Sequence, residues 1–243
     1  MKGIEITHLT KRFGGLCAVD DLSVSIAPGR ITGLIGPNGS GKTTLMNMIS
    51  GLYKPDCGTI TIDDKIFEFI EPIKLRGLHI TRTFQDGRLI NQLSVDDNLL
   101  LAIAETGLLK SLWQFKTGEM IARVNATLEK IGLTGHRNKL AEELSYGQRK
   151  LLELGRALIQ DADIYLLDEP FSGLQEKKIE HVLGLIGALK KQKKTVVIIE
   201  HNMGLIKQLT DHIIVLDHGA LLASGKPNTV LKNKYVQHAY LGV

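Results

Sequence analysis

The segment Gly36–Thr44 reads GPNGSGKTT and matches in full the pattern G-x-x-x-x-G-K-[ST] of a phosphate-binding loop. Its glycines permit a tight path that points backbone N–H groups inward at a polyphosphate. Lys42 would supply a point charge for the terminal phosphates, and the Thr43 hydroxyl is a suitable ligand for Mg²⁺. A plain glycine-rich turn before a helix is disfavoured because the pattern is complete. The residues expected to bind a nucleotide here are Gly36, Asn38, Gly39, Ser40, Gly41, Lys42, Thr43 and Thr44.

Two adjacent carboxylates, Asp168 and Glu169, follow the apolar segment Ile164–Leu167, which predicts a strand. Such a strand would deliver the Asp168 carboxylate to the phosphate site, where it can hold Mg²⁺ directly or through water. Glu169 points elsewhere and is placed to polarise an attacking water. A solvated strand end is the alternative, and the presence of the phosphate loop disfavours it.

His201 and Gln85 complete the candidate catalytic set. His201 follows the predicted strand Val196–Ile199, so a parallel neighbour would present it at the same sheet edge as Asp168. The other histidines are interpreted as structural or surface residues. Gln85, after the apolar Phe84, has an amide that can reach Mg²⁺ or the attacking water.

Phe13, in the sequence KRFGG, is a candidate to stack on an adenine ring. Aromatic side chains belong to a core more often than to a cofactor platform, so Phe13 alone carries little weight. Its interpretation depends on the motifs that follow it along the chain.

The segment Leu144–Gln148, LSYGQ, predicts the start of a helix. Ser145 and Gln148 have the spacing of a capping box, so the helix should begin at Tyr146. A helix N-terminus with an N-cap Ser and Gly147 can bind an anion. Since the phosphate loop already serves this chain's own nucleotide, a second anion site makes sense if it meets the γ-phosphate held by another copy. Without the flanking motifs, an ordinary capped helix would explain the segment.

Alternating strands and helices must position these groups. Helices are expected over 42–50 and 121–131 and from Tyr146 onward, and Ser94 with Asp97 forms a second capping box. Strands followed by helices indicate a parallel sheet, and the first strands look like an antiparallel layer. The fold class is therefore α/β, with a nucleotide-binding core and an inserted helical part. The predicted strands are 2–8, 22–26, 31–35, 59–63, 164–167, 196–199 and 213–216.

The bulk composition narrows the class of protein. The 243 residues carry a net charge of +4, spread along the chain, which favours a solvated surface over a nucleic-acid patch. Cys17 and Cys57 suggest neither a zinc site nor a disulfide framework and fit a reducing cytosol. No signal peptide is expected at the N-terminus, and the apolar run Leu99–Ala104 is far shorter than the about 20 residues that span a bilayer.

Taken in order, Phe13, GPNGSGKT, Gln85, LSYGQ, IYLLDE and His201 resemble the ATP-binding subunit of ABC transporters, over nearly the whole chain. The resemblance implies a P-loop NTPase core and the cofactors ATP and Mg²⁺. It implies catalytic roles for Glu169, His201 and Gln85, and metal contacts from Thr43, Gln85 and Asp168. Phe13 would be the adenine platform. The signature segment, Leu144–Gln148, would contact the nucleotide of another copy through Ser145, Gly147 and Gln148.

The implied organisation is one ABC ATPase domain over residues 1–243. Its nucleotide-binding core would comprise about 1–87 and 160–225, its helical subdomain about 88–159, and its C-terminal helical tail about 226–243. The implied partners are a second ATPase in a homodimer or heterodimer, integral-membrane permease subunits and, through the complex, a solute-binding protein. The chain would lie peripherally on the cytoplasmic face of the cell membrane.

Closer similarity points to the ATPases of branched-chain amino-acid importers. FGGLCAVDDLS, RTFQ at 82–85, Tyr146 in the signature segment and AYLG at 239–242 carry it. Urea importers and the lipopolysaccharide-export ATPase share parts of this pattern, so import of an amino acid, amide or urea leads and lipopolysaccharide export is the alternative. A soluble ABC ATPase that acts on ribosomes or DNA, or a regulatory module without turnover, is disfavoured. Gln175 replaces the usual acidic residue of the D-loop, which leaves communication between two ATP sites open.

Overall fold

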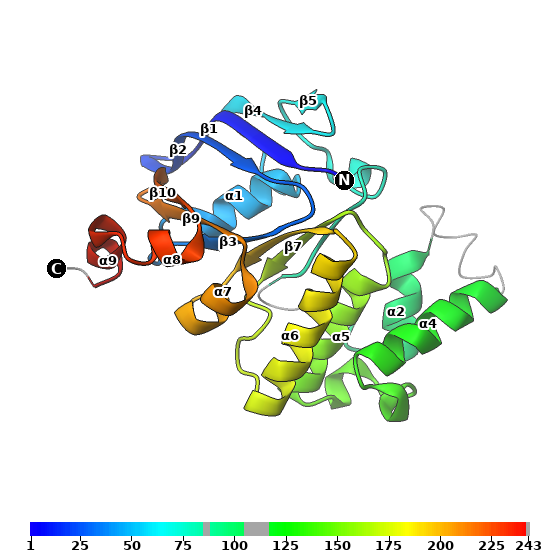
Figure 1. Ribbon diagram of the computed structural model, residues 1–243. Coiled ribbons are helices and arrows are strands. Elements are labelled where there is room, and N and C mark those ends of the chain that lie inside the picture. Colours follow the sequence, from blue (N-terminus) through cyan, green and yellow to red (C-terminus); the bar gives the residue numbers. More distant parts are fainter. Residues whose placement is uncertain (85–87, 105–116, 242–243) are drawn as a thin grey trace. The chain divides into compact units, whose positions relative to one another are not determined.

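A largely parallel sheet collects strands from distant parts of the chain (Figure 1). The computed structural model describes residues 1–84, 88–104 and 117–241. The strand order is β10-β9-β3-β8-β7-β6, and all neighbours are parallel except the β9–β10 hairpin. The strands are β3 (Ile31–Ile35), β6 (Ile80–Arg82), β7 (Ile164–Asp168), β8 (Thr195–Ile199), β9 (His212–Asp217) and β10 (Ala220–Gly225).

Each central strand is a short apolar run that is buried along its whole length, as expected for a parallel sheet covered on both faces. Because parallel strands end at the same edge, the residues that follow β3, β7 and β8 emerge together. The phosphate loop follows β3, Glu169 follows β7, and His201 comes two residues after β8. The sheet therefore gathers groups that lie far apart in the sequence.

An antiparallel sheet in the order β2-β1-β4-β5 accompanies the parallel one. The first half of β1 alternates buried and exposed side chains, with Ile4 and Ile6 buried. The helix α1 (Lys42–Ile49) contributes Leu45, Met46 and Met48 to the core cluster that both sheets share. The strands are β1 (Ile4–Phe13), β2 (Leu16–Ile26), β4 (Cys57–Ile62) and β5 (Lys65–Phe67).

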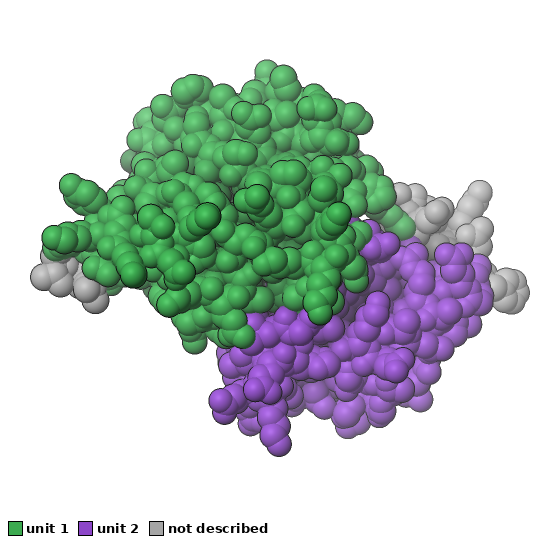
Figure 2. Space-filling view, viewed as in Figure 1, with its two compact units in different colours: residues 1–82, 163–169, 186–243 green, residues 83–162, 170–185 purple. Residues whose placement is uncertain are grey.

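The chain divides into two compact units, coloured separately in Figure 2. Unit 1 comprises Met1–Arg82, Asp163–Glu169 and Ile186–Val243, and unit 2 comprises Thr83–Ala162 and Pro170–Leu185. In unit 2, α2, α4 and α5 contact one another, and Gly155 marks the close approach of α5 to Leu99 and Ile131. Besides α1, the helices of the two units together are α2 (Val95–Ile103), α4 (Gly118–Lys130), α5 (Tyr146–Leu158), α6 (Glu176–Lys191), α7 (Met203–Leu209), α8 (Pro227–Val230) and α9 (Lys234–Leu241).

The α/β class with a parallel sheet, an antiparallel layer and a helical part is confirmed. β2 is longer than the expected 22–26, because it also pairs with the second half of β1. The expected helix 121–131 starts earlier, since the Thr117 hydroxyl accepts a hydrogen bond from the Met120 N–H and caps α4. The stretch 105–118, whose sequence predicts a loop or a helix junction, lies mostly outside the described residues, and Gly118 already belongs to α4.

Short strands and 3-10 turns complete the described part. β5 and β6 are three residues long, too short for a sequence period to reveal them. β10, ALLASG, does not alternate and was not expected either. The 3-10 turns are η1 (Pro72–Lys74), η2 (Thr134–His136) and η3 (Ala141–Glu143).

Candidate functional site

The phosphate loop owes its path to glycines with left-handed backbones. Gly36, Gly39 and Gly41 have φ of 150°, 79° and 98°. A Cβ on Gly36 would lie 2.1 Å from the carbonyl oxygen of Leu216, and one on Gly41 would lie 2.3 Å from that of Ala18. Nothing lies within 4 Å of a Cβ on Gly39, which leaves that side of the loop open. Gly36 and Gly41 are therefore fixed by packing as well as by backbone angle.

Lys42 places a cation against the loop. Its side chain is buried, and Nζ donates to the carbonyl oxygens of Gly36 and Pro37, both at 2.8 Å. Burial lowers the pKa of the Lys42 ammonium, and the charges of Glu169 and Asp168 oppose that shift. An ammonium that contacts the loop and is influenced by the charges of two carboxylates suits a polyphosphate with its metal ion.

The start of α1 suits an anion. No side chain caps this helix and its first turn carries no acidic residue, so the positive end of the helix dipole is not compensated locally. Thr43 is exposed on the first turn and Thr44 is half-buried. In the loop Ser40 is buried, whereas Asn38 and Gly39 are exposed.

Glu169 and His201 form a hydrogen-bonded pair, with Oε1 and Nε2 2.8 Å apart. β7 and β8 are parallel with Asp168 opposite Ile199, which brings the residues after both strands to one edge. The Glu169 backbone is left-handed, with φ of 47°, and its N–H donates to the Ile199 carbonyl at 3.0 Å. Such a backbone in a non-glycine residue is strained and is often found at functional sites. The sequence order predicted the shared edge but not this contact.

The turn that carries His201 is held by Glu200. The buried Glu200 carboxylate accepts hydrogen bonds from the backbone N–H groups of His201 at 3.0 Å and Asn202 at 3.4 Å. Asn202 in turn caps α7. These bonds fix the backbone from which the His201 ring projects.

Sequence reasoning missed a buried partner of Asp168. The guanidinium of Arg82, at the end of β6, lies 3.3 Å from Asp168 Oδ2, and both side chains are almost fully buried, at 4% and 3% exposed. Arg82 belongs to RTFQ, which had served only as a clue to family. No spacing rule indicated its burial, because that depends on the pairing of β6 with the distant β7.

Phe13 lies at the end of β1 and is exposed, which argues against a core role. Its ring meets Tyr53 edge to face, with centroids 5.2 Å apart and planes at 70°. Lys11 Nζ lies 5.5 Å from the Phe13 ring centre. An exposed aromatic pair with a nearby cation is a suitable platform for a planar base.

The signature segment forms the expected capping box in unit 2. The Gln148 N–H donates to Ser145 Oγ at 3.4 Å, and the Ser145 N–H donates to Gln148 Oε1 at 2.9 Å. The Gln148 amide nitrogen also lies 2.9 Å from His136 Nε2. Gln148 thus serves the start of the helix. Tyr146 is more than half exposed, and its ring lies over Gly173.

Lys178 is a second residue that sequence reasoning missed. A Cβ on Gly147 would lie 2.7 Å from Lys178 Nζ, so the ammonium sits against the first turn of α5. Gln175 immediately precedes α6, and its carbonyl oxygen accepts hydrogen bonds from the backbone N–H groups of Lys178 and Ile179 in the first turn of that helix. Positive charge at this helix start adds to the helix dipole.

Gln85 lies outside the described residues, but its neighbours are tied to α5. The Phe84 N–H donates to Glu153 Oε1 at 2.8 Å, and the Arg88 carbonyl accepts from the Arg156 guanidinium. Burial raises the pKa of Glu153, and the adjacent Lys150 opposes that shift. Two residues one turn apart on the helix of the signature segment therefore hold both flanks of the segment 85–87.

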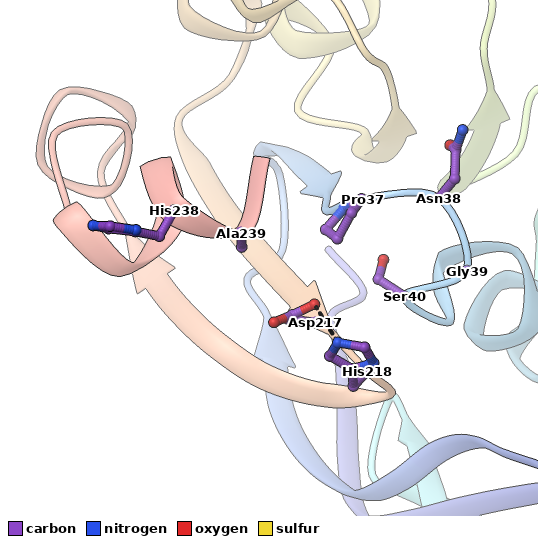
Figure 3. Close-up of a pocket in the computed structure, with 8 residues that line it drawn as sticks. All are labelled: Pro37, Asn38, Gly39, Ser40, Asp217, His218, His238 and Ala239. Carbon is purple, nitrogen blue, oxygen red and sulfur yellow. Dashed lines mark ion pairs between the residues drawn. The ribbon is translucent and has the colours of Figure 1, made fainter. Parts of the chain in front are cut away.

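A cavity of about 310 Å³ lies beside the phosphate loop (Figure 3). Figure 3 shows Asp217 and His218 below the loop, and His238 of α9 pointing away from it. The lining contains neither the Lys42 ammonium nor the Glu169–His201 pair, so the cavity is distinct from the candidate catalytic groups. Its lining is Pro37, Asn38, Gly39, Ser40, Asp217, His218, His238 and Ala239.

In residues 1–84, 88–104 and 117–241, no group of three or more His, Cys, Asp or Glu side chains could hold a metal ion. Within those same ranges no helix is long and apolar enough to span a bilayer.

The amino-acid sequence is similar to that of known ABC transporter proteins. Residues 19–172 match the family described as ABC transporter. The chain is 37% identical to the high-affinity branched-chain amino acid transport ATP-binding protein LivG of Escherichia coli K12, over 98% of this chain and 97% of that protein. It is 34% identical to a probable branched-chain amino acid transport ATP-binding protein LivG of Archaeoglobus fulgidus, over 100% and 96%.

The fold is also similar to that of solved ATP-binding cassettes. A nucleotide-free ATP-binding cassette from an ABC transporter has a TM-score of 0.88 at 33% identity, with full coverage of both chains. A dimeric ATP-binding cassette in a post-hydrolysis state, bound to ADP and Pi, has a TM-score of 0.79 at 26% identity, over 92% of this chain and 98% of that one. The resemblance carried by the ordered motifs is confirmed. The chain belongs to the ABC transporter family, in which it is an ATP-binding subunit and an ATPase.

Proposed function

We propose that the phosphate loop binds the β- and γ-phosphates of ATP through its backbone N–H groups and Lys42, while Phe13 stacks on the adenine ring. The left-handed glycines, the buried ammonium and the uncapped start of α1 support the phosphate contacts. The exposure of Phe13 supports the stacking. Asn38, Ser40 and Thr44 belong to the same loop and complete the cradle.

The bound nucleotide would carry Mg²⁺. Thr43 and Asp168 would hold this metal ion, directly or through water. Mg²⁺ is usually held by one or two protein oxygens together with substrate phosphates, so a site of this kind needs no cluster of carboxylates. The charge of Asp168 raises the pKa of the Lys42 ammonium against the effect of burial, so the carboxylate lies near enough to the loop to share a metal ion with it. The ion would neutralise charge on the phosphates. Gln85 remains a third ligand proposed from sequence alone.

Glu169 polarises the water that attacks the γ-phosphate, and His201 holds the Glu169 carboxylate in place. The 2.8 Å contact between the two side chains is the observation that carries this proposal. The tether of Glu169 to the Ile199 carbonyl and of His201 to Glu200 limits how far either group can move. Water adds to the γ-phosphorus while the bond to the bridging oxygen breaks, which yields ADP and phosphate.

The signature segment completes the ATP site of a second ATPase subunit. Ser145 and Gly147 would contact the γ-phosphate bound to the other subunit's loop, and Gln148 would support them through the capping box. The Lys178 ammonium at the start of α5 supports an anion at this position. The second subunit is either another copy of this chain or a related ATPase. ATP closes such a dimer, and hydrolysis reopens it.

The dimer drives integral-membrane permease subunits, on whose cytoplasmic face the chain lies peripherally. We infer a branched-chain amino acid, or a related amide or urea, as the imported substrate, delivered by a solute-binding protein. The names of relatives at 34–37% identity support this choice. Lipopolysaccharide export remains the second candidate, because the motifs of that ATPase overlap with those found here.

Uptake by the assembled transporter tests the transport proposal. The chain would be purified with the membrane subunits that accompany it and reconstituted in vesicles. We expect ATP-dependent accumulation of labelled leucine, isoleucine or valine that requires the solute-binding protein. Uptake of urea alone would move the proposal to the amide and urea branch. Extraction of lipopolysaccharide without amino-acid uptake would overturn it.

A further inference from the structure

Arg82 is unusual because its charged side chain is almost fully buried. Its side chain is 4% exposed, at the end of the short strand β6. A guanidinium stays charged in a protein and needs polar partners when it is buried. The partners of Arg82 therefore indicate what its position accomplishes.

The guanidinium reaches two elements of unit 1. Nη1 donates to Asn47 Oδ1 at 2.7 Å and to Ser50 Oγ at 2.6 Å, and Nη2 donates to Asp168 Oδ2 at 3.3 Å. Asn47 lies on the last turn of α1 and Ser50 caps its C-terminal end. One planar, rigid group thus connects the end of α1 with the carboxylate that terminates β7.

These contacts link the two elements that carry the proposed metal ligands. Thr43 is on the first turn of α1, and Asp168 is at the end of β7. Thr43 is carried by a helix and Asp168 by a strand, and the two elements pack in one core cluster. Arg82 adds a polar connection between them, through side-chain hydrogen bonds at both ends.

We propose that Arg82 is a positioning residue for the Mg²⁺ of bound ATP. By holding Asp168 Oδ2 it sets the rotation of the carboxylate, and through Asn47 and Ser50 it fixes that carboxylate relative to the helix of Thr43. This inference rests on the proposed role of Asp168 as a metal ligand. Partners that orient a ligand commonly alter metal affinity by about 10- to 100-fold when they are removed.

A purely structural role is the competing explanation. A buried arginine–carboxylate pair can hold two elements together without any influence on a metal, and its loss would then lower stability alone. The two explanations differ in one measurable quantity, the ratio of nucleotide affinity with Mg²⁺ to that without it. Positioning predicts that this ratio falls, whereas a structural role leaves it unchanged.

The test compares Arg82→Lys with the wild-type chain. Affinity for a non-hydrolysable ATP analogue would be measured by calorimetry, first in excess Mg²⁺ and then in EDTA. Lysine keeps the charge but cannot reach Asn47, Ser50 and Asp168 at once. We expect the Mg²⁺-dependent gain in affinity to fall about tenfold or more, with little change in EDTA. Equal weakening under both conditions, or no change in the ratio, would overturn the proposal.

Three further variants keep the result interpretable. Arg137→Lys makes the same change in another arginine–aspartate pair, with Asp96, and should leave the ratio unchanged. Ser50→Ala loosens the far end of the connection, and a smaller loss in the same direction is expected even if Arg82→Lys does not fold. Asp168→Asn tests the proposed function itself. If Asp168→Asn leaves the affinity ratio unchanged, Asp168 is not a ligand of the metal. If Asp168→Asn lowers the ratio but Arg82→Lys and Ser50→Ala do not, Asp168 keeps its proposed role and the positioning role of Arg82 is excluded.

Discussion

Glu169 combines a strained backbone with a short side-chain contact. A left-handed conformation costs a non-glycine residue about 1–3 kcal/mol, which the surrounding structure must supply. Here the Glu169 N–H bonds to Ile199 and the carboxylate bonds to His201. The same two tethers that stabilise the backbone also aim the carboxylate, so strain and geometry at this residue have one origin.

Replacing Glu169 by Gln should separate binding from hydrolysis. The amide keeps the size of the side chain and a hydrogen bond to His201 but cannot accept a proton from water. We expect ATP hydrolysis to fall by about 10²- to 10⁴-fold, the usual contribution of a general base, with unchanged ATP affinity. Phosphate release and calorimetry would measure the two effects. The exposed Glu5→Gln is the control, and hydrolysis near the wild-type rate in Glu169→Gln would exclude Glu169 as the base.

Phe13 should contribute to affinity without contributing to turnover. Loss of an aromatic stacking partner costs about 1–3 kcal/mol per base, so Phe13→Ala should raise the KM for ATP about tenfold with kcat unchanged. Leu16→Ala removes an exposed apolar side chain from the paired position on β2 and is a matched control. Steady-state kinetics would compare them. Equal KM values for the two variants would remove Phe13 from the nucleotide site.

At the residue scale, the sequence located Glu169 and His201 but not Arg82 or Lys178. The first two stand next to complete apolar strands in a known order, so their shared edge follows from parallel pairing. Arg82 and Lys178 owe their places to side chains that fold back onto other elements. An arginine at the end of a three-residue strand, or a lysine on a helix, has no sequence spacing that predicts such a contact.

At the element scale, the phosphate loop tolerates side chains unequally. Gly36→Ala would place its Cβ against the Leu216 carbonyl, so the loop must move away from β9. We expect Gly36→Ala to lose ATP binding and a large part of its stability. Gly184→Ala, in the exposed middle of α6 with no atoms within 4 Å of the added Cβ, should instead raise stability by about 0.5–1 kcal/mol. Urea unfolding and nucleotide titration would measure both, and unimpaired binding by Gly36→Ala would contradict the geometry.

Helix α5 links the signature segment to the flanks of the segment 85–87 through Glu153 and Arg156. Glu153→Ala removes the acceptor of the Phe84 N–H, whereas Glu153→Gln keeps an oxygen there. Both variants also remove the carboxylate that pairs with Lys150. The difference between them therefore isolates the bond to Phe84.

We expect Glu153→Ala to be less stable than Glu153→Gln by about 1–3 kcal/mol, the cost of a buried donor left without its acceptor. Hydrolysis should also fall further in Glu153→Ala, because the segment next to Gln85 loses an anchor. Denaturant unfolding and phosphate release would show this. Identical behaviour of the two variants would mean that the bond to Phe84 is dispensable.

Elements differ in how well the sequence predicts them. The apolar central strands and the helix starts with Ser145 and Ser94 were predicted because both burial and capping leave local patterns. β6 and β10 were not, because three residues or a run without alternation give no period. Yet β6 carries Arg82, whose guanidinium contacts Asp168, so an element that leaves no pattern still contributes a contact to the candidate site.

At the scale of the whole molecule, the fold class followed from strands that alternate with helices, whereas the identity of the partners cannot be read from this chain. Strands that alternate with helices restrict the topology, and the family match confirms it. Which second ATPase and which permease the chain joins depends on surfaces of those other proteins.

In the proposed mechanism, the ATP site on one subunit is completed by the signature segment of another subunit. Complementation between two inactive variants tests it most directly. Lys42→Ala disables the phosphate loop and leaves the signature segment intact, while Ser145→Arg does the reverse. Ser94→Arg places the same change at the cap of α2 and controls for the loss of a helix cap.

The two variants would carry different affinity tags, and dimers that contain one copy of each would be isolated through both tags in sequence. Such a dimer has one ATP site in which an intact loop meets an intact signature segment. We predict that Lys42→Ala and Ser145→Arg are each inactive alone, that Ser94→Arg keeps its activity, and that the mixed dimer hydrolyses ATP. A mixed dimer as inactive as either variant, or a Ser145→Arg chain that hydrolyses ATP by itself, would contradict the account.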